Sequence, residues 1–219
     1  MFSTHLLIAL LSCLVAYLLG SISFAVVFSR LFSHKDVRDF GSGNAGMTNV
    51  MRVSGALPGI LTFVFDFLKG FASAYLGGVV FSYLFEATSN PVFHSVYGQL
   101  VCAFFCMLGH VFPVFFKFRG GKGVATGVGA FFAICPIAAA TGLGVFAVLF
   151  LITGIISLSS LMGTASVVVV FLILMNTSIN VIPQIVLSAS IALIIFIKHK
   201  ENIIRLIHGE EKKLKVKKK

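Results

Sequence analysis

The sequence predicts an all-α integral membrane protein with seven transmembrane helices. Of its 219 residues, 58% are apolar and 11% are charged, whereas charged residues make up about a quarter of an ordinary soluble domain. Uncharged runs recur along the whole chain, and several approach the roughly 20 residues that one helical crossing of a bilayer needs. A cleavable signal peptide is not expected, because residues 1–29 contain no Lys or Arg.

The first three spans follow directly from the uncharged runs. We expect them at residues 6–28, 57–84 and 96–116. The second run carries Asp66 and Lys69, which lie three residues apart and therefore share one face of a helix. Charges inside a membrane are costly, so we interpret the pair as mutual neutralisation that supports the bundle, with Lys69 also within reach of the polar site described below.

The tract from residue 123 to 197 contains no Asp, Glu, Lys or Arg and has to be divided. Basic residues precede it at Lys117, Arg119 and Lys122 and follow it in the tail, so the positive-inside rule places both ends in the cytoplasm. The number of crossings between them is then even. Four spans of roughly 17 to 19 residues fit, with breaks near residues 141–144, 157–160 and 176–183.

The same rule fixes the orientation of the remaining chain. The N-terminus and the loop at residues 86–93 are expected outside the cell, and the loop at 32–55 and the C-terminus inside. The net charge of +10 does not indicate a nucleic-acid partner, because six of the seventeen basic residues lie in residues 212–219, where they suit anionic lipid. We therefore expect one membrane-embedded domain, 1–219, with a basic cytoplasmic tail at 212–219. The four cysteines lie in apolar runs without metal-ligand or disulfide spacing, so no metal is expected.

Three polar segments carry the unusual chemistry, and the first lies at residues 41–52. Its glycines expose backbone N–H groups that can cradle an anion, hydroxyls and amides surround them, and Arg52 can add a bidentate clamp. A glycine-rich turn that caps the next helix is an equally good interpretation of these residue types.

The second segment, residues 109–126, contains Gly120, Gly121 and Lys122 just before the fourth span. It resembles a nucleotide-binding loop only superficially, because Gly123 stands where Ser or Thr would hold magnesium. Lys122 at a helix N-terminus is suited to binding an anion. The alternative is one more flanking cytoplasmic lysine.

The third segment, residues 198–205, follows the seventh span. His199, Asn202 and Arg205 recur every three residues, so on a continuing helix they share one face. The alternative, an amphipathic helix that lies on the membrane, is compatible with this arrangement.

Together these segments resemble the bacterial acyl-phosphate:glycerol-3-phosphate acyltransferases, the PlsY family. The pattern GSGNxGxTNVxR is matched at residues 41–52, DxxKG at 66–70, GHxFPxFxxFxGGKGVAT at 109–126 and HxxNIxRLxxGxE at 199–211. The resemblance covers nearly the full chain. Two positions depart from it, because many members have Pro in place of Ala45 and a small residue in place of Met47.

The resemblance implies transfer of a fatty acyl group from acyl-phosphate to the 1-hydroxyl of glycerol 3-phosphate. The products are 1-acylglycerol 3-phosphate (lysophosphatidic acid) and phosphate, in the first step of bacterial phospholipid synthesis, and no cofactor is needed. Matched residue by residue, the catalytic set is Lys122, Arg52 and His199. Substrate-binding residues are Ser42, Asn44, Thr48, Asn49, Asn202 and the backbone of Gly41, Gly43, Gly120 and Gly121, and the supporting residues are Asp66, Lys69 and Arg205.

No nucleophile with an adjacent base can be traced, so a phosphate oxygen of a substrate is expected to take the hydroxyl proton, as suggested for the family. His199, a matched motif residue of a type that can titrate near neutrality, is expected to donate a hydrogen bond to a phosphate. The expected location is the bacterial inner membrane with the site on its cytoplasmic face, and the expected partners are membrane lipids and an acyl-phosphate-producing enzyme. A secondary transporter of an organic anion is the alternative, because buried charges and glycine-broken helices occur in such proteins.

Overall fold

The computed structural model describes residues 2–213, and its regular structure is entirely helical. In chain order the helices are α1 (Phe2–Gly20), α2 (Phe24–Ser33), α3 (Met47–Ser54), α4 (Ala56–Thr88), α5 (Ser95–Val111), α6 (Val124–Ile134), α7 (Pro136–Thr153), α8 (Ile156–Leu174), α9 (Val181–Lys198) and α10 (Lys200–Ile207). Short 3₁₀ helices η1 (Val37–Asp39), η2 (Pro91–Phe93) and η3 (Val114–Phe116) lie in the connections. The predicted all-α fold is confirmed, and residues 214–219 of the basic tail lie outside the described part.

Six of the described helices, α1, α4, α5, α7, α8 and α9, are long and apolar enough to cross a bilayer. The spans predicted at 57–84 and 96–116 correspond to α4 and to α5 with η3. The seventh apolar helix, α6, has 11 residues. It is about 16 Å long, roughly half of the hydrocarbon core, so the predicted length of this span is wrong.

The first predicted span, residues 6–28, is interrupted between α1 and α2. A Cβ on Gly20 would collide with the carbonyl of Cys106 on α5, so the glycine lets the two backbones approach closely where α1 ends. Carbonyl oxygens at such a break need other donors. Lys69 Nζ on α4 supplies them, donating to Gly20 O at 3.0 Å and to Ile22 O at 2.8 Å.

The break between α6 and α7 falls at Cys135, just before Pro136 begins α7, and not at residues 141–144, which lie inside α7. Pro is favoured in the first turn of a helix because its missing N–H has no helical partner there. Gly142 serves packing, since a Cβ on Gly142 or on Gly163 of α8 would come within 2.9 Å of the other residue's carbonyl oxygen. Small residues at membrane helix contacts have this effect without breaking the helix.

The two later breaks are close to their predicted places. The break predicted at 157–160 lies at residues 154–155, and its serines form the first turn of α8. Gly154 adopts φ of 69°, the left-handed conformation that commonly ends a helix. The break predicted at 176–183 is confirmed between α8 and α9.

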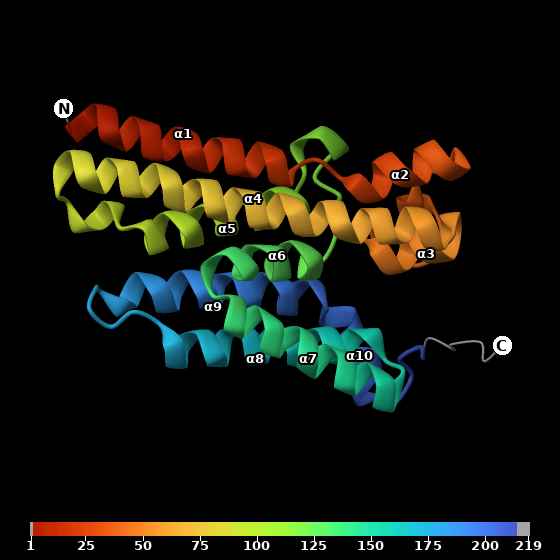
Figure 1. The fold of residues 1–219 in the computed structure, drawn as a ribbon. Coiled ribbons are helices and arrows are strands. Elements are labelled where there is room, and N and C mark those ends of the chain that lie inside the picture. Colours follow the sequence, from red (N-terminus) through yellow and green to blue (C-terminus); the bar gives the residue numbers. More distant parts are fainter. Residues whose placement is uncertain (1, 214–219) are drawn as a thin grey trace.

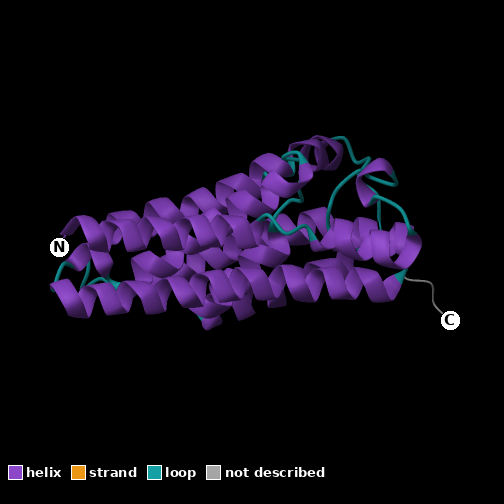
Figure 2. Cartoon of the chain, turned by 90° about the horizontal axis from the view of Figure 1, so that it is seen from above, coloured by secondary structure: helices purple, strands orange, loops and turns teal. Residues whose placement is uncertain are grey.

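The bundle has two layers of helices with α6 between them (Figure 1). One layer holds α1, α4 and α5, the other holds α7, α8 and α9, and α6 contacts α4 and α7. The start of α1 and the whole of α10 lie at opposite ends of the bundle (Figure 1). Figure 2 shows the loops gathered at the two ends, with most of them near the C-terminus. That end brings the three polar segments together.

Candidate active site

The glycine-rich loop before α3 is shaped from within by Asn49. This buried side chain accepts a hydrogen bond from the Ser42 N–H at 2.9 Å. Its Nδ2 donates at 2.9 to 3.1 Å to three backbone oxygens, those of Val37, Phe40 and Asn44. Gly41 and Gly43 have φ of 62° and 69°, values that favour glycine. The amide of Asn49 is therefore used to build the loop, and it supports the predicted anion site from behind.

The polar side chains of this segment remain accessible. Ser42 on the loop and Arg52 on α3 are exposed, and Asn44 and Thr48 are half-buried. Among the ion pairs of residues 2–213, none includes Arg52. A substrate anion could therefore reach the guanidinium without displacing a protein carboxylate.

The loop before α6 packs against the last turn of α5. Gly121 N donates to His110 O at 3.1 Å, so this N–H, predicted to bind substrate, is already engaged. A Cβ on Gly120 would collide with His110 O, and a Cβ on Gly121 with the His110 ring and Ala45 O. The two glycines thus join the second polar segment to the first. Lys122 follows them, just before the N-terminus of α6.

The third segment is not one continuous helix, because α9 ends at Lys198 and α10 begins at Lys200, with His199 at the junction. His199 is buried, and its Nδ1 lies 2.8 Å from Ile195 O. A carbonyl oxygen can only accept, so Nδ1 carries the hydrogen. On a neutral ring Nε2 is then an acceptor.

Lys122 and the third segment meet in a connected polar cluster. Lys122 Nζ donates to Asn202 Oδ1, and Asn202 Nδ2 donates to Glu211 Oε1 at 2.6 Å. The other Glu211 oxygen accepts from Arg205 Nε at 2.6 Å, and Ser157 Oγ on α8 donates to Oε1 at 2.8 Å. Neither Glu211 nor Ser157 was predicted as a site residue, although Glu211 ends a matched motif and Ser157 begins one of the predicted breaks. Their importance depends on a contact between α8 and the segment after α10.

Burial changes the protonation of this cluster. Burial lowers the pKa of Lys122 to about 8. Burial, with the nearby Lys122 charge, lowers the pKa of His199 to about 4, so the ring is neutral at physiological pH. Burial raises the pKa of Glu211, but hydrogen bonds from Arg205, Asn202 and Ser157 outweigh it and keep this pKa below its ordinary value. A neutral ring whose Nδ1 hydrogen is engaged does not fit the predicted titration near neutrality or the predicted donation to a phosphate, and Lys122 titrates closer to neutrality.

Asp66 and Lys69 pair as predicted, with Asp66 Oδ1 at 2.8 Å from Lys69 Nζ and both side chains buried. The Lys69 ammonium also binds the two carbonyl oxygens at the α1–α2 break. It is thus committed to the fold of the bundle. These contacts give a structural role to the buried charges, which were one of the two features that favoured a transporter.

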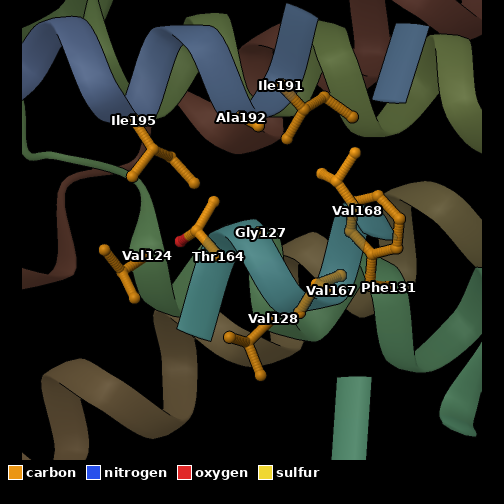
Figure 3. Close-up of a pocket in the computed structure, with 10 residues that line it drawn as sticks. All are labelled: Val124, Gly127, Val128, Phe131, Thr164, Val167, Val168, Ile191, Ala192 and Ile195. Carbon is orange, nitrogen blue, oxygen red and sulfur yellow. The ribbon is translucent and has the colours of Figure 1, made fainter. Parts of the chain in front are cut away.

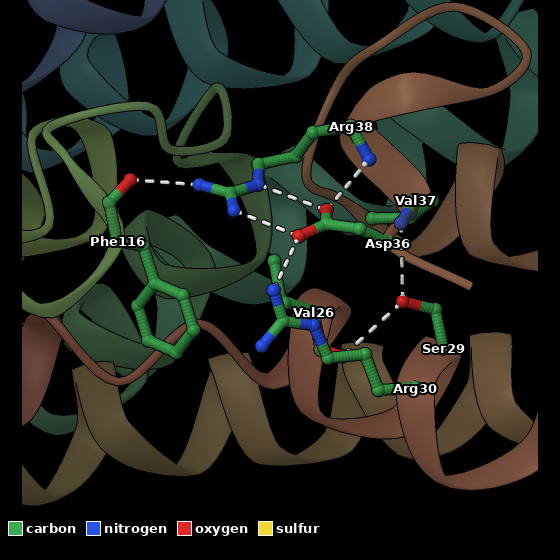
Figure 4. A network of polar contacts seen from close by, with 7 residues as sticks. All are labelled: Val26, Ser29, Arg30, Asp36, Val37, Arg38 and Phe116. Carbon is green, nitrogen blue, oxygen red and sulfur yellow. Dashed lines mark hydrogen bonds and ion pairs between the residues drawn. The ribbon is translucent and has the colours of Figure 1, made fainter. Parts of the chain in front are cut away.

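A second charged network joins the connection between α2 and α3 to the second polar segment (Figure 4). Arg38 binds Asp36 through two nitrogens, Nε to Oδ1 at 2.9 Å and Nη2 to Oδ2 at 2.7 Å, and donates from Nη1 to Phe116 O at 2.7 Å. Arg30 donates to Asp36 Oδ2 at 2.8 Å. Hydrogen bonds from Arg38 hold the pKa of Asp36 well below its usual range. This network was not predicted from the sequence, because its contact between Arg38 and Phe116 joins residues 78 positions apart.

Figure 3 shows an apolar crevice between three of the helices. It is lined by residues of α6, α8 and α9, among them Val124, Gly127, Phe131, Thr164, Ile191 and Ile195. Val124 follows Lys122 by two residues, and Ile195 O accepts the His199 hydrogen bond. The crevice encloses about 20 Å³, so an alkyl chain would have to separate the helices to enter it. Within residues 2–213, no group of three or more His, Cys, Asp or Glu side chains is placed to hold a metal ion.

Comparisons with known proteins agree with this arrangement. Residues 10–209 match the family model described as glycerol-3-phosphate acyltransferase. The chain is 38% identical to the glycerol-3-phosphate acyltransferase of Finegoldia magna, covering 92% of this chain and 93% of the relative, and 37% identical to glycerol-3-phosphate acyltransferase 2 of Bacillus anthracis, covering 94% and 98%.

Solved structures of a relative are also similar. They are crystal structures of PlsY (YgiH), an integral membrane glycerol 3-phosphate acyltransferase. Its glycerol 3-phosphate form has a TM-score of 0.81 at 34% identity, over 94% of this chain and 96% of the other. Its lysophosphatidic acid form has a TM-score of 0.79 at 33% identity, over 94% and 95%. The chain belongs to the glycerol-3-phosphate acyltransferase family.

Proposed function

We propose that this protein transfers a fatty acyl group from acyl-phosphate to the 1-hydroxyl of glycerol 3-phosphate. The observation that carries the proposal is the position of Lys122, a partly buried cation between a glycine-rich loop and an apolar crevice. Both substrates are phosphorylated and the donor also carries a hydrocarbon chain. A cation beside an apolar crevice supplies the two environments that such a donor needs.

Different basic groups bind the phosphates of the two substrates. Lys122 adds its charge to the positive N-terminal end of α6. Exposed Arg52 offers a bidentate donor for the second phosphate. Ser42, Asn44 and Thr48 add polar groups beside it. The acyl chain lies between α6, α8 and α9 and is held by apolar contacts alone.

The transfer needs no covalent enzyme intermediate. The glycerol hydroxyl oxygen attacks the acyl carbonyl carbon, the bond from that carbon to the phosphate oxygen breaks, and the hydroxyl proton passes to a phosphate oxygen. Acyl-phosphate is an activated anhydride, so correct placement of the two substrates can lower the barrier by about 7 to 11 kcal/mol. Lys122 and Arg52 stabilise the developing negative charge.

In this scheme His199 orients glycerol 3-phosphate, the substrate that receives the acyl group. Its Nδ1 is held by Ile195 O, so Nε2 accepts a hydrogen bond from a hydroxyl of glycerol 3-phosphate. With a pKa of about 4, the ring is a weak base, well below the value near 7 that favours general base catalysis. We therefore assign proton acceptance to phosphate and hydroxyl placement to His199.

We further propose that the site faces the cytoplasm of a bacterial cell. The support is the distribution of Lys and Arg, which the positive-inside rule places at the end of the bundle that holds α2, α3 and α10. A cytoplasmic site suits functional coupling to an enzyme that produces acyl-phosphate.

The test is acylation by the purified full chain in lipid vesicles. Palmitoyl-phosphate and glycerol 3-phosphate, without ATP or metal, are expected to give 1-acylglycerol 3-phosphate and phosphate in equal amounts. Lys122→Ala is the matched control, expected to turn over at a much lower but measurable rate. Efficient turnover with acyl-CoA and none with acyl-phosphate would overturn the donor assignment, and uptake of substrate without a new ester would indicate a transporter.

A further inference from the structure

The position of Lys122 depends on how its loop sits on α5. The loop has one backbone anchor there, the hydrogen bond from Gly121 N to His110 O at 3.1 Å. Both preceding glycines lie so close to His110 that neither has room for a Cβ. Gly120 lies against the His110 carbonyl and Gly121 against the imidazole, so the ring packs directly against the residue that precedes Lys122.

His110 is in turn fixed from its other side. Its side chain is 7% exposed, and its Nδ1 lies 3.5 Å from Asp66 Oδ1 on α4. Asp66 is held at 2.8 Å by Lys69, and Lys69 also binds the oxygens of Gly20 and Ile22. A chain of contacts thus runs from the α1–α2 break, through two charged residues of α4, to the loop that carries Lys122.

The same side of Gly121 also contacts the glycine-rich loop, because a Cβ on this residue would meet Ala45 O as well as the His110 ring. The His110 ring and the Ala45 carbonyl therefore both pack directly against Gly121. This contact sets the position of the loop of residues 41–46 relative to Lys122. A shift of the ring would change the distance between the two places where the substrate anions bind.

We propose that His110 is a positioning residue of the acyltransferase, which acts by fixing the Gly120–Gly121 turn and hence the Lys122 ammonium. The inference rests on the proposed function, in which Lys122 binds a substrate phosphate. His110 itself touches no substrate, since its ring is enclosed by Asp66, Gly121 and the end of α5.

The experiment is a double-mutant cycle in lipid vesicles with palmitoyl-phosphate and glycerol 3-phosphate. Lys122→Met first identifies which substrate's KM depends on the ammonium. His110→Ala is expected to raise the KM for that same substrate about tenfold, with a smaller change in kcat, and to change it less than twofold when Lys122 is already Met. His110→Asn, which keeps a donor toward Asp66, is expected to recover much of the loss and replaces the alanine variant if that variant does not fold.

Cys106→Ala is the matched control. Cys106 lies one turn earlier on α5, is buried, and donates to Lys69 O at 3.6 Å without touching the loop. It is expected to lower thermal stability without changing either KM. Equal effects of His110→Ala in both backgrounds, or a KM change confined to the other substrate, would refute the positioning role while leaving the proposed function intact. If Lys122→Met changes neither KM, both the positioning role and the phosphate role of Lys122 are wrong.

Discussion

The lowered pKa of Lys122 predicts an alkaline limit on activity. Below about pH 8 the ammonium carries its charge, and above that pH it loses the proton. Phosphate monoesters have their second pKa near 6, so the charge of the glycerol 3-phosphate phosphate stays constant in this range. Any loss of catalytic efficiency between pH 8 and 9.5 should therefore arise from the enzyme.

The size of the loss follows from the protonated fraction. With a pKa of about 8, about one Lys122 in eleven is charged at pH 9. If only the charged form binds the phosphate productively, kcat/KM falls about tenfold for each pH unit above the pKa. His199 is not expected to add a second limb in the same range, since its pKa lies near 4.

The assay is kcat/KM for each substrate at about half-unit steps from pH 6.5 to 9.5, with short reaction times and a blank for spontaneous hydrolysis of palmitoyl-phosphate. Lys122→Arg is the informative variant, because a guanidinium stays protonated throughout this range. It is expected to have lower efficiency but a flat alkaline profile. The reasoning fails if wild-type efficiency stays constant to pH 9.5, or if Lys122→Arg declines with the same apparent pKa as the wild type.

Three further predictions address other parts of the site and fold. His199→Gln is expected to retain more turnover than His199→Ala, because an amide oxygen can still accept from the substrate hydroxyl, whereas equal losses of about 100-fold or more in kcat would indicate an obligatory base. Gly127→Ile should fill the crevice and lower kcat/KM for palmitoyl-phosphate more than for octanoyl-phosphate, and an unchanged ratio would place the acyl chain elsewhere. Reporters at Lys35 and within residues 86–93 should report cytoplasmic and external positions respectively, and a cytoplasmic signal from the 86–93 loop would overturn the orientation.

Much of the fold could be predicted because membrane burial excludes charge from most of the chain. The uncharged runs identified α4 and α5 with η3, and the break between α8 and α9. The errors have a common origin in contacts between distant residues. Gly20 ends α1 against Cys106, and Gly142 looks like a helix breaker in sequence but packs against Gly163. A local pattern cannot distinguish a glycine that ends a helix from one that lets two helices touch.

In the candidate site, too, the sequence predicts which residues gather but not how their surroundings change their chemistry. The motifs placed Lys122, Asn202 and His199 in one region, and the structure brings Lys122 and Asn202 into direct contact. Their chemistry depends on neighbours that no motif specifies. Because Ile195 O accepts from Nδ1 of His199, Nε2 of the neutral ring becomes an acceptor, and burial shifts both nearby pKa values downward. From residue types alone, His199 was expected to change its protonation near neutral pH. In the folded protein the pKa of His199 falls to about 4 and that of Lys122 to about 8, so Lys122 is the group that titrates closer to neutrality.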